Sequence, residues 1–229
     1  MFLQIAYDSR PILKLAGSAS LKSQRHFSDY DFNSMITRTH KPVVIYNEFR
    51  KILSHKDMYF IEFKIEYIDG SKLKIHDTTK LRSATFKNIY YVKIDYVVWN
   101  DYHFKEVSIM YIFKKTKYSV EDIKVDYDQL VKDGDYYKAL KRLFSIHRMT
   151  KNKKEGVKLT RFFNSSKLYE VNSNLKAIML MKQTYDTKDV QKKILINLKY
   201  LKIDPKTNID DMIISNDKIL NDSAKKYLI

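Results

Sequence analysis

The spacing of apolar residues changes once along this chain, near residue 118. Before that point apolar and polar residues alternate, which is the two-residue period of a β-strand with one buried face. After it, apolar residues recur every three or four positions, which is the period of an amphipathic helix. The sequence therefore predicts an α+β protein, with a mixed or antiparallel sheet and helices over residues 1–118 and a basic helical domain over 119–229.

Two β-hairpins are the clearest local predictions. Asp69-Gly70 separates YFIEFKIEY from SKLKIHD, and Asn100-Asp101 separates IYYVKIDYVVW from EVSIMYIFKK; such dipeptides favour tight turns between strands. Two shorter strands are expected at 12–16 and 31–36. Helices are expected at 43–53, from about 119, and at 136–149, 168–184, 188–201 and 218–228, with a charged loop at 151–154.

Composition excludes several classes of protein. The 229 residues are 44% hydrophobic with only 4 Gly and 3 Pro, so a buried core is expected and low-complexity disorder is excluded. No Cys is present, which excludes disulfide frameworks, thiolate zinc sites and cysteine nucleophiles. There is no apolar run of about 18 residues and no signal-peptide pattern at the N-terminus. We therefore expect no membrane association and a cytoplasmic location.

The net charge of +16 is unevenly distributed. Residues 138–206 hold 18 Lys or Arg against 5 Asp or Glu, a net charge of +13. Lys138, Lys141 and Arg142 lie three and four residues apart, so they form one basic edge of the expected helix. This edge can bind the phosphates of a nucleotide or nucleic acid, or it can be an ordinary solvated face.

The segment LAGSASLKSQRHFSDYDF, residues 15–32, carries the pattern with most chemical content. A short strand leads into Gly17-Ser18, where a residue without a side chain and a hydroxyl donor can approach a triphosphate. Asp29 and Asp31 differ by two, so on a strand both carboxylates project from one face, roughly 7 Å apart. Carboxylate pairs of this kind suit two Mg²⁺ ions in phosphoryl transfer.

A third carboxylate is expected on a neighbouring strand. Asp95 is a single acid in the apolar run YVKIDYVVW, where burial is costly without a metal ion or a cationic partner. Glu62 and Glu66 are rivals, although they alternate with apolar residues as solvent-facing positions do. An ion pair of Asp95 with Lys93, or with a lysine of another strand, is the structural alternative to a role in a site.

Taken together, Gly-Ser, a spacer of about ten residues, Ser-Asp-Tyr-Asp and a later Asp among aliphatic residues resemble the DNA polymerase β-type nucleotidyltransferase superfamily. The resemblance implies a nucleotidyltransferase palm in which Gly17 and Ser18 bind nucleotide phosphates. It implies that Asp29, Asp31 and Asp95 bind two Mg²⁺ or Mn²⁺ ions. The spacer departs from many members, because it begins Ala19-Ser20-Leu21-Lys22 rather than with a glycine.

The segments DYYKALKRLFSIHRM and FFNSSKLYEVNSNLKAI are similar to helices of nucleotidyltransferases from large DNA viruses, including poly(A) polymerase-like proteins. This narrower resemblance implies transfer of a nucleoside monophosphate from an NTP, expected to be ATP, to the 3′ hydroxyl of a nucleic acid, expected to be RNA. It also implies a location in the host cytoplasm or the virion. A homodimer or a protein partner is compatible with the sequence.

Two alternatives remain open. One is an inactive relative that serves as an RNA-binding or assembly subunit, although the presence of all three expected acids argues against it because clustered negative charge is costly. The other is a transferase whose acceptor is a hydroxyl of a protein or a small molecule.

Overall fold

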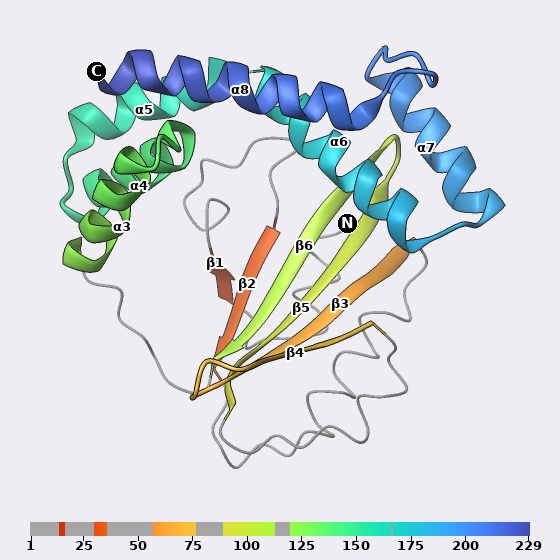
Figure 1. Ribbon diagram of the computed structural model, residues 1–229, viewed down its shortest axis with the longest axis horizontal. Coiled ribbons are helices and arrows are strands. Elements are labelled where there is room, and N and C mark those ends of the chain that lie inside the picture. The colour runs from red at the N-terminus through yellow and green to blue at the C-terminus, as the bar shows by residue number, and fades with distance from the viewer. Residues whose placement is uncertain (1–13, 17–29, 36–56, 77–88, 113–119, 166) are drawn as a thin grey trace. The chain divides into compact units, whose positions relative to one another are not determined.

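The computed structural model describes residues 14–16, 30–35, 57–76, 89–112, 120–165 and 167–229 (Figure 1). Six strands lie within these ranges: β1 (Lys14–Ala16), β2 (Tyr30–Met35), β3 (Met58–Tyr67), β4 (Lys72–Ile75), β5 (Ile89–Asn100) and β6 (His103–Ile112). The helices are α3 (Val120–Lys132), α4 (Tyr136–Met149), α5 (Lys153–Ser165), α6 (Lys167–Thr184), α7 (Lys188–Tyr200) and α8 (Ile209–Leu228). The predicted α+β class is confirmed, whereas the helix predicted at 43–53 lies outside the described residues.

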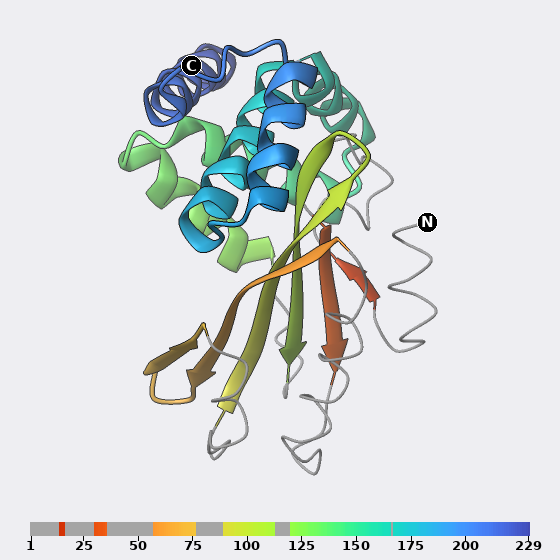
Figure 2. The same ribbon diagram turned by 90° about the vertical axis from the view of Figure 1, so that its right-hand side faces the viewer.

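The strands form one sheet in the order β1-β2-β6-β5-β3-β4 (Figures 1 and 2). Both predicted hairpins are present, because β3 pairs with β4 and β5 pairs with β6 in antiparallel register. Strand β2 pairs with β6 in parallel, so the sheet is mixed. This parallel pair joins segments more than 70 residues apart in the chain, so it is a non-local contact that local periodicity does not predict.

The two faces of the sheet differ in polarity. On β5, Val92, Ile94 and Tyr96 are almost completely buried, and they are matched by buried Phe63 and Ile65 on β3. The alternate positions carry polar side chains, which are partly exposed: Glu62, Lys64, Glu66, Lys93, Asp95 and Ser108. One face therefore forms the apolar core of the sheet, and the other face presents charges.

The chain divides into two compact units. The first comprises residues 1–115 and 177–205, and the second comprises 116–176 and 206–229. The sequence predicts a single division near residue 118, and one limit of the units lies close to it. Residues 177–205 nevertheless belong with the sheet, because α7 contacts β6 and the Tyr185 hydroxyl donates a hydrogen bond to the Phe60 carbonyl oxygen at 2.5 Å.

Lys193 attaches α7 to the start of β3 in the first unit. Its ammonium donates hydrogen bonds to Asp57 Oδ1 at 2.5 Å, the Tyr59 hydroxyl at 2.6 Å and Asp189 Oδ2 at 2.9 Å. Its side chain is only 13% exposed. Burial alone would lower the pKa of the Lys193 ammonium, but the bonds to Asp189, Asp57 and Tyr59 outweigh burial and raise this pKa.

Lys193→Met is expected to lower the free energy of unfolding by about 2 kcal/mol, because it leaves Asp57 and Tyr59 without their shared cation. Urea unfolding measures this loss, and the exposed neighbour Lys192→Met should change stability by less than about 0.5 kcal/mol. Because the pKa of Lys193 is higher in the folded protein, its ion pairs contribute fully to stability below the ordinary lysine pKa of about 10.4. This contribution falls as pH rises further. The difference between wild type and Lys193→Met should therefore be full at pH 8 and smaller at pH 11. An equal difference at both values would contradict this assignment.

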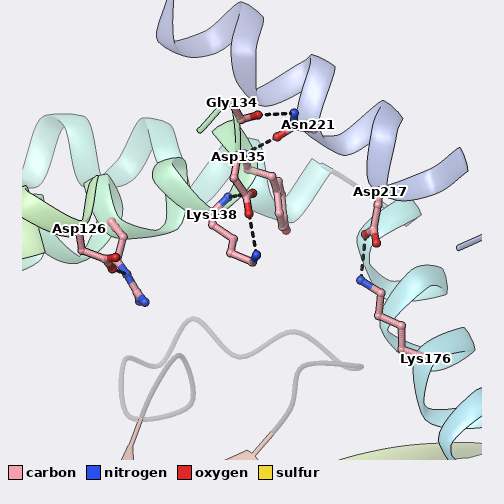
Figure 3. A network of polar contacts seen from close by, with 9 residues as sticks. Asp126, Gly134, Asp135, Lys138, Lys176, Asp217 and Asn221 are labelled. Carbon is pink, nitrogen blue, oxygen red and sulfur yellow. Dashed lines mark hydrogen bonds and ion pairs between the residues drawn. The ribbon is translucent and has the colours of Figure 1, made fainter. Parts of the chain in front are cut away.

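The second unit has its own core, formed by α4, α5 and α8 around Leu140, Leu159, Phe163 and Ala224. Asn221 of α8 ties this core to the turn between α3 and α4: its amide donates to the Gly134 carbonyl oxygen at 2.8 Å, and its Oδ1 accepts from the Tyr137 N–H at 3.0 Å (Figure 3). Gly134 has a φ of 75°, a conformation that glycine adopts without strain, and it ends α3.

Two helices differ from the prediction. Helix α5 begins at Lys153, inside the segment predicted to be a charged loop, and α8 begins nine residues earlier than predicted. The start of α8 is explained by Asn208, whose Oδ1 accepts from the Asp210 N–H at 3.1 Å as an N-cap.

None of the described helices combines the length and the apolar character that a membrane span requires.

Candidate functional site

Two of the three acids proposed from the sequence occupy one row across the sheet. Asp31 of β2 pairs with Ser108 of β6, and Ser108 pairs in turn with Asp95 of β5. The row continues to Glu62 of β3, which pairs with Asp95. Since neighbouring strands lie about 4.8 Å apart, the backbones of Asp31 and Asp95 are separated by roughly 10 Å with Ser108 between them. Acids that are 64 positions apart in sequence are thus brought to one level of the sheet.

The Asp95 carboxylate is held by two neighbours that bind the same oxygen. The Ser108 hydroxyl donates a hydrogen bond to Oδ1, and the Lys93 ammonium lies 2.9 Å from Oδ1. No hydrogen bond or ion pair to Oδ2 occurs among the residues that the structure describes. The side chain is 18% exposed. Among the described residues, Asp95 is therefore held through Oδ1.

Asp95 belongs to an apolar strand, as the sequence indicates, but the alternation of side chains places it on the polar face of the sheet. Asp95 shares the polar face with Lys93, and the ion pair that the sequence offered as an alternative is present. Because Oδ2 takes no part in that pair, the ion pair and a ligand-binding role are compatible. The apolar neighbours of Asp95 in sequence point to the opposite, buried face.

The rival acids have their own basic partners. Glu62 lies 3.5 Å from the Lys74 ammonium. Glu66 accepts a hydrogen bond from the Tyr91 hydroxyl at 2.6 Å and lies 3.7 Å from Lys72. Glu66 pairs with Tyr91, four residues from Asp95 along β5, so it is outside the row, whereas Glu62 is in it. Of the two rivals, Glu62 is the one that the register brings next to Asp95.

Gly17, Ser18 and Asp29 lie outside the described residues, and Asp31 is described by its backbone position. Within the ranges that are described, no three His, Asp or Glu side chains converge as a metal site. The donor chemistry of the row is nevertheless suitable for Mg²⁺ or Mn²⁺, since hard cations prefer carboxylate oxygens and Asp95 has one, Oδ2, to which no described residue is bonded. Asp29 and Asp31 as further ligands remain a prediction from the sequence.

The basic residues predicted on α4 all have contacts within the second unit. Lys138 forms an ion pair with Asp135 at 2.6 Å, and Arg142 pairs with Asp126 of α3 (Figure 3). The Lys141 ammonium lies 5.0 Å from the ring centroids of Tyr137 and Tyr169, which is cation–π geometry. Lys138 and Arg142 remain at least half exposed, so a contact with phosphate is sterically open to both.

Ser108 is the site residue that sequence reasoning missed. The predicted hairpin at Asn100-Asp101 carried the signal, because continuing its antiparallel register backward from the turn pairs residue 95 with residue 108. A hydroxyl at the non-apolar position of EVSIMYI, opposite an acid on the partner strand, is a typical cross-strand hydrogen-bonding pair.

Comparison with solved structures assigns the fold. The crystal structure of the M. chilensis Mg662 protein complexed with GTP matches with a TM-score of 0.67 at 10% identity, covering 99% of this chain and 92% of that one. A structure described as a new nucleotidyl transferase encoded by a Megaviridae ORFan gene matches with a TM-score of 0.65 at 11% identity, covering 99% and 90%. A further structure of the same description gives 0.61 at 13% identity, covering 99% and 93%.

No protein-family model and no curated protein sequence matches the chain. At 10–13% identity the likeness to solved structures defines a shared fold. The chain therefore shares the fold of these solved structures, over nearly its full length.

Proposed function

We propose that this protein is a nucleotidyltransferase that transfers a nucleoside monophosphate from an NTP to the 3′ hydroxyl of RNA. The observation that carries the proposal is the row formed by Asp31, Ser108 and Asp95 across three neighbouring strands. The shared fold supports it, because two of the matching structures are described as a nucleotidyl transferase and another is a complex with GTP.

In the proposed reaction the 3′ oxygen of the acceptor attacks the α-phosphorus of the NTP. The bond from this phosphorus to the bridging oxygen breaks, pyrophosphate leaves, and the acceptor hydroxyl releases its proton to solvent water. Two bound Mg²⁺ ions would supply charge neutralisation for the triphosphate and a lower pKa for the attacking hydroxyl. Asp29, Asp31 and Asp95 are the residues proposed to hold them.

The chain's own residues have distinct roles in this proposal. Ser108 and Lys93 position Asp95 by binding Oδ1, so that Oδ2 faces the ligand in one orientation. Asp95 favours loss of the proton from the acceptor hydroxyl. Gly17 and Ser18 are proposed to bind the terminal phosphates through backbone N–H groups and the serine hydroxyl.

Lys138, Lys141 and Arg142 are proposed as further contacts to phosphate. Their present partners Asp135, Tyr137 and Asp126 mean that a bound phosphate shares or replaces existing interactions. Replacing all three by Gln should lower transfer to RNA several-fold and weaken its dependence on salt, because fewer counterions are released. Transfer to a small-molecule hydroxyl should be almost unchanged by the same substitutions. An unchanged salt dependence with RNA would contradict the proposed contact of these residues with phosphate.

The proposal is tested by incubating the protein with Mg²⁺, labelled NTP and an RNA primer. ATP is the expected donor, and GTP is assayed beside it because a protein with this fold was crystallised with GTP. Single-nucleotide extension of the primer with release of pyrophosphate is the expected product. DNA, protein and small hydroxyl compounds are offered as alternative acceptors. Absence of transfer to every acceptor would overturn the proposal and favour the inactive RNA-binding relative.

A further inference from the structure

Two exposed tyrosine rings stack on each other in the first unit, one from the turn between β5 and β6 and one from the end of α7. Tyr102 belongs to the turn between β5 and β6, and Tyr200 is the last residue of α7. Their planes differ by 10° and their centroids are 5.8 Å apart. Tyr102 is 57% exposed and Tyr200 is 48% exposed. Such exposure leaves part of the surface of both rings open to solvent.

The end of α7 next to this pair is basic. Residues 188–206 contain six lysines and two aspartates. Lys199 and Lys202 flank Tyr200 in sequence, both are exposed, and neither forms an ion pair with a residue that the structure describes. Positive charge beside open aromatic rings is the combination that single-stranded nucleic acids bind, because bases stack on the rings and phosphates contact the lysines.

Lys202 adds a second observation. It has a φ of 58°, the left-handed conformation that glycine normally occupies just after a helix. The surrounding bonds are those of a Schellman motif, from the Lys202 N–H to the Lys199 carbonyl at 3.0 Å and from the Ile203 N–H to the Leu198 carbonyl at 2.9 Å. A lysine at this position carries a conformational cost that glycine would avoid.

We propose that Tyr102 and Tyr200, with Lys199 and Lys202, form a binding surface for single-stranded RNA. A base stacks on the open tyrosine surface while the two ammonium groups contact neighbouring phosphates. The surface rests on the proposed function in that it would hold the acceptor strand of the transfer reaction. It adds a strand-binding site in the sheet unit that is separate in the chain from the basic edge of α4.

The proposal is tested by fluorescence anisotropy with a labelled 12-nucleotide single-stranded RNA, using the full chain without NTP or metal ion. Tyr200→Leu and Tyr102→Leu should each weaken binding about tenfold, because a base then has one stacking ring fewer. Tyr200→Phe keeps the ring and should bind within about twofold of wild type. The double change Lys199→Gln and Lys202→Gln should lower the salt slope by roughly 1.4, or about 0.7 for each phosphate that a lysine no longer neutralises.

Two matched variants sharpen the test. Asp101 is the exposed acid next to Tyr102 in the turn, so Asp101→Asn should tighten RNA binding about twofold by removing a repulsive charge. Asn tolerates the φ of 52° at this position. Lys218→Gln and Lys226→Gln, two exposed lysines of α8 in the second unit, should leave the affinity unchanged. Circular dichroism and thermal melts confirm that each variant is folded.

The outcomes separate this inference from the proposed function. If RNA binds through the tyrosines but no nucleotide is transferred to any acceptor, the surface stands and the transferase proposal fails. If transfer occurs while Tyr102→Leu and Tyr200→Leu bind RNA as wild type does, the surface is overturned. It is also overturned if the tyrosine variants change only the oligomeric state measured by light scattering, which would identify a protein interface.

Discussion

Asp31→Asn and Asp95→Asn are each expected to lower the rate of nucleotide transfer by about 10³-fold while leaving the fold intact. Each change removes a negative charge from the row that pairs Asp31 with Ser108 and Ser108 with Asp95. Asn keeps the size and hydrogen-bonding oxygen of Asp, so the sheet register is preserved. Primer extension under single-turnover conditions measures the rate, and circular dichroism monitors folding.

Glu62→Gln and Glu66→Gln are the matched controls, because both remove a carboxylate from the same polar face of the sheet. Glu66 is outside the row, so its variant should transfer nucleotide within about threefold of wild type. Glu62 is in the row but is paired with Lys74, and its variant should lose less activity than Asp95→Asn. A larger loss in Glu62→Gln than in Asp95→Asn would assign the third carboxylate to Glu62.

Ser108→Ala is expected to lower the transfer rate by about 10-fold to 100-fold, the range found when a partner of a metal-binding side chain is removed. Its hydroxyl donates to Asp95 Oδ1, and without it Lys93 is the one partner of the carboxylate left among the described residues. As a positioning residue, Ser108 should affect the maximal rate and the affinity for Mn²⁺, while the KM for RNA stays constant. Rate measurements and Mn²⁺ titration followed by electron paramagnetic resonance measure the two quantities.

Ser108→Thr tests whether the hydroxyl or the packing is responsible. Thr retains the hydroxyl and suits a strand, so it should recover most of the activity that Ser108→Ala removes. Equal losses of activity in both variants would indicate that Ser108 has a structural role only. The same conclusion would follow if Ser108→Ala lost activity together with melting temperature while its affinity for Mn²⁺ stayed unchanged.

Local pattern is enough to predict most elements of this fold. The alternation around Asp69-Gly70 and Asn100-Asp101 predicts both hairpins, and the helical period predicts α4 with the bounds Tyr136–Met149. The helical period does not predict α5, because the composition at the start of this helix obscures the pattern. Helix α5 begins with Lys153 and Lys154 and has Gly156 in its first turn, so its sequence resembles a charged loop.

The sequence predicts which acids belong to the candidate site, but it does not predict how the strands place them relative to one another. Motif and composition predict Asp31 and Asp95 as site residues, yet the parallel pairing of β2 with β6 that places Asp31 beside Ser108, the partner of Asp95, is a contact between distant segments. Such pairings depend on the whole topology and leave no periodic signal. The ion pairs of α4 also include one local and one non-local contact. Asp135 lies three residues before Lys138, so this pair is predictable from sequence, whereas Asp126 contacts Arg142 only because α3 packs on α4.

The position of bound metal ions tests the central claim most directly. Crystals grown with Mn²⁺ and a non-hydrolysable NTP analogue would be measured for anomalous scattering at the manganese absorption edge. The predicted result is a pair of peaks about 3.5 to 4 Å apart, bound by carboxylate oxygens of Asp31 and Asp95, with the triphosphate bridging them. Manganese bound elsewhere, with Asp31 and Asp95 making no contact to it, would contradict the assignment of this row as the active site.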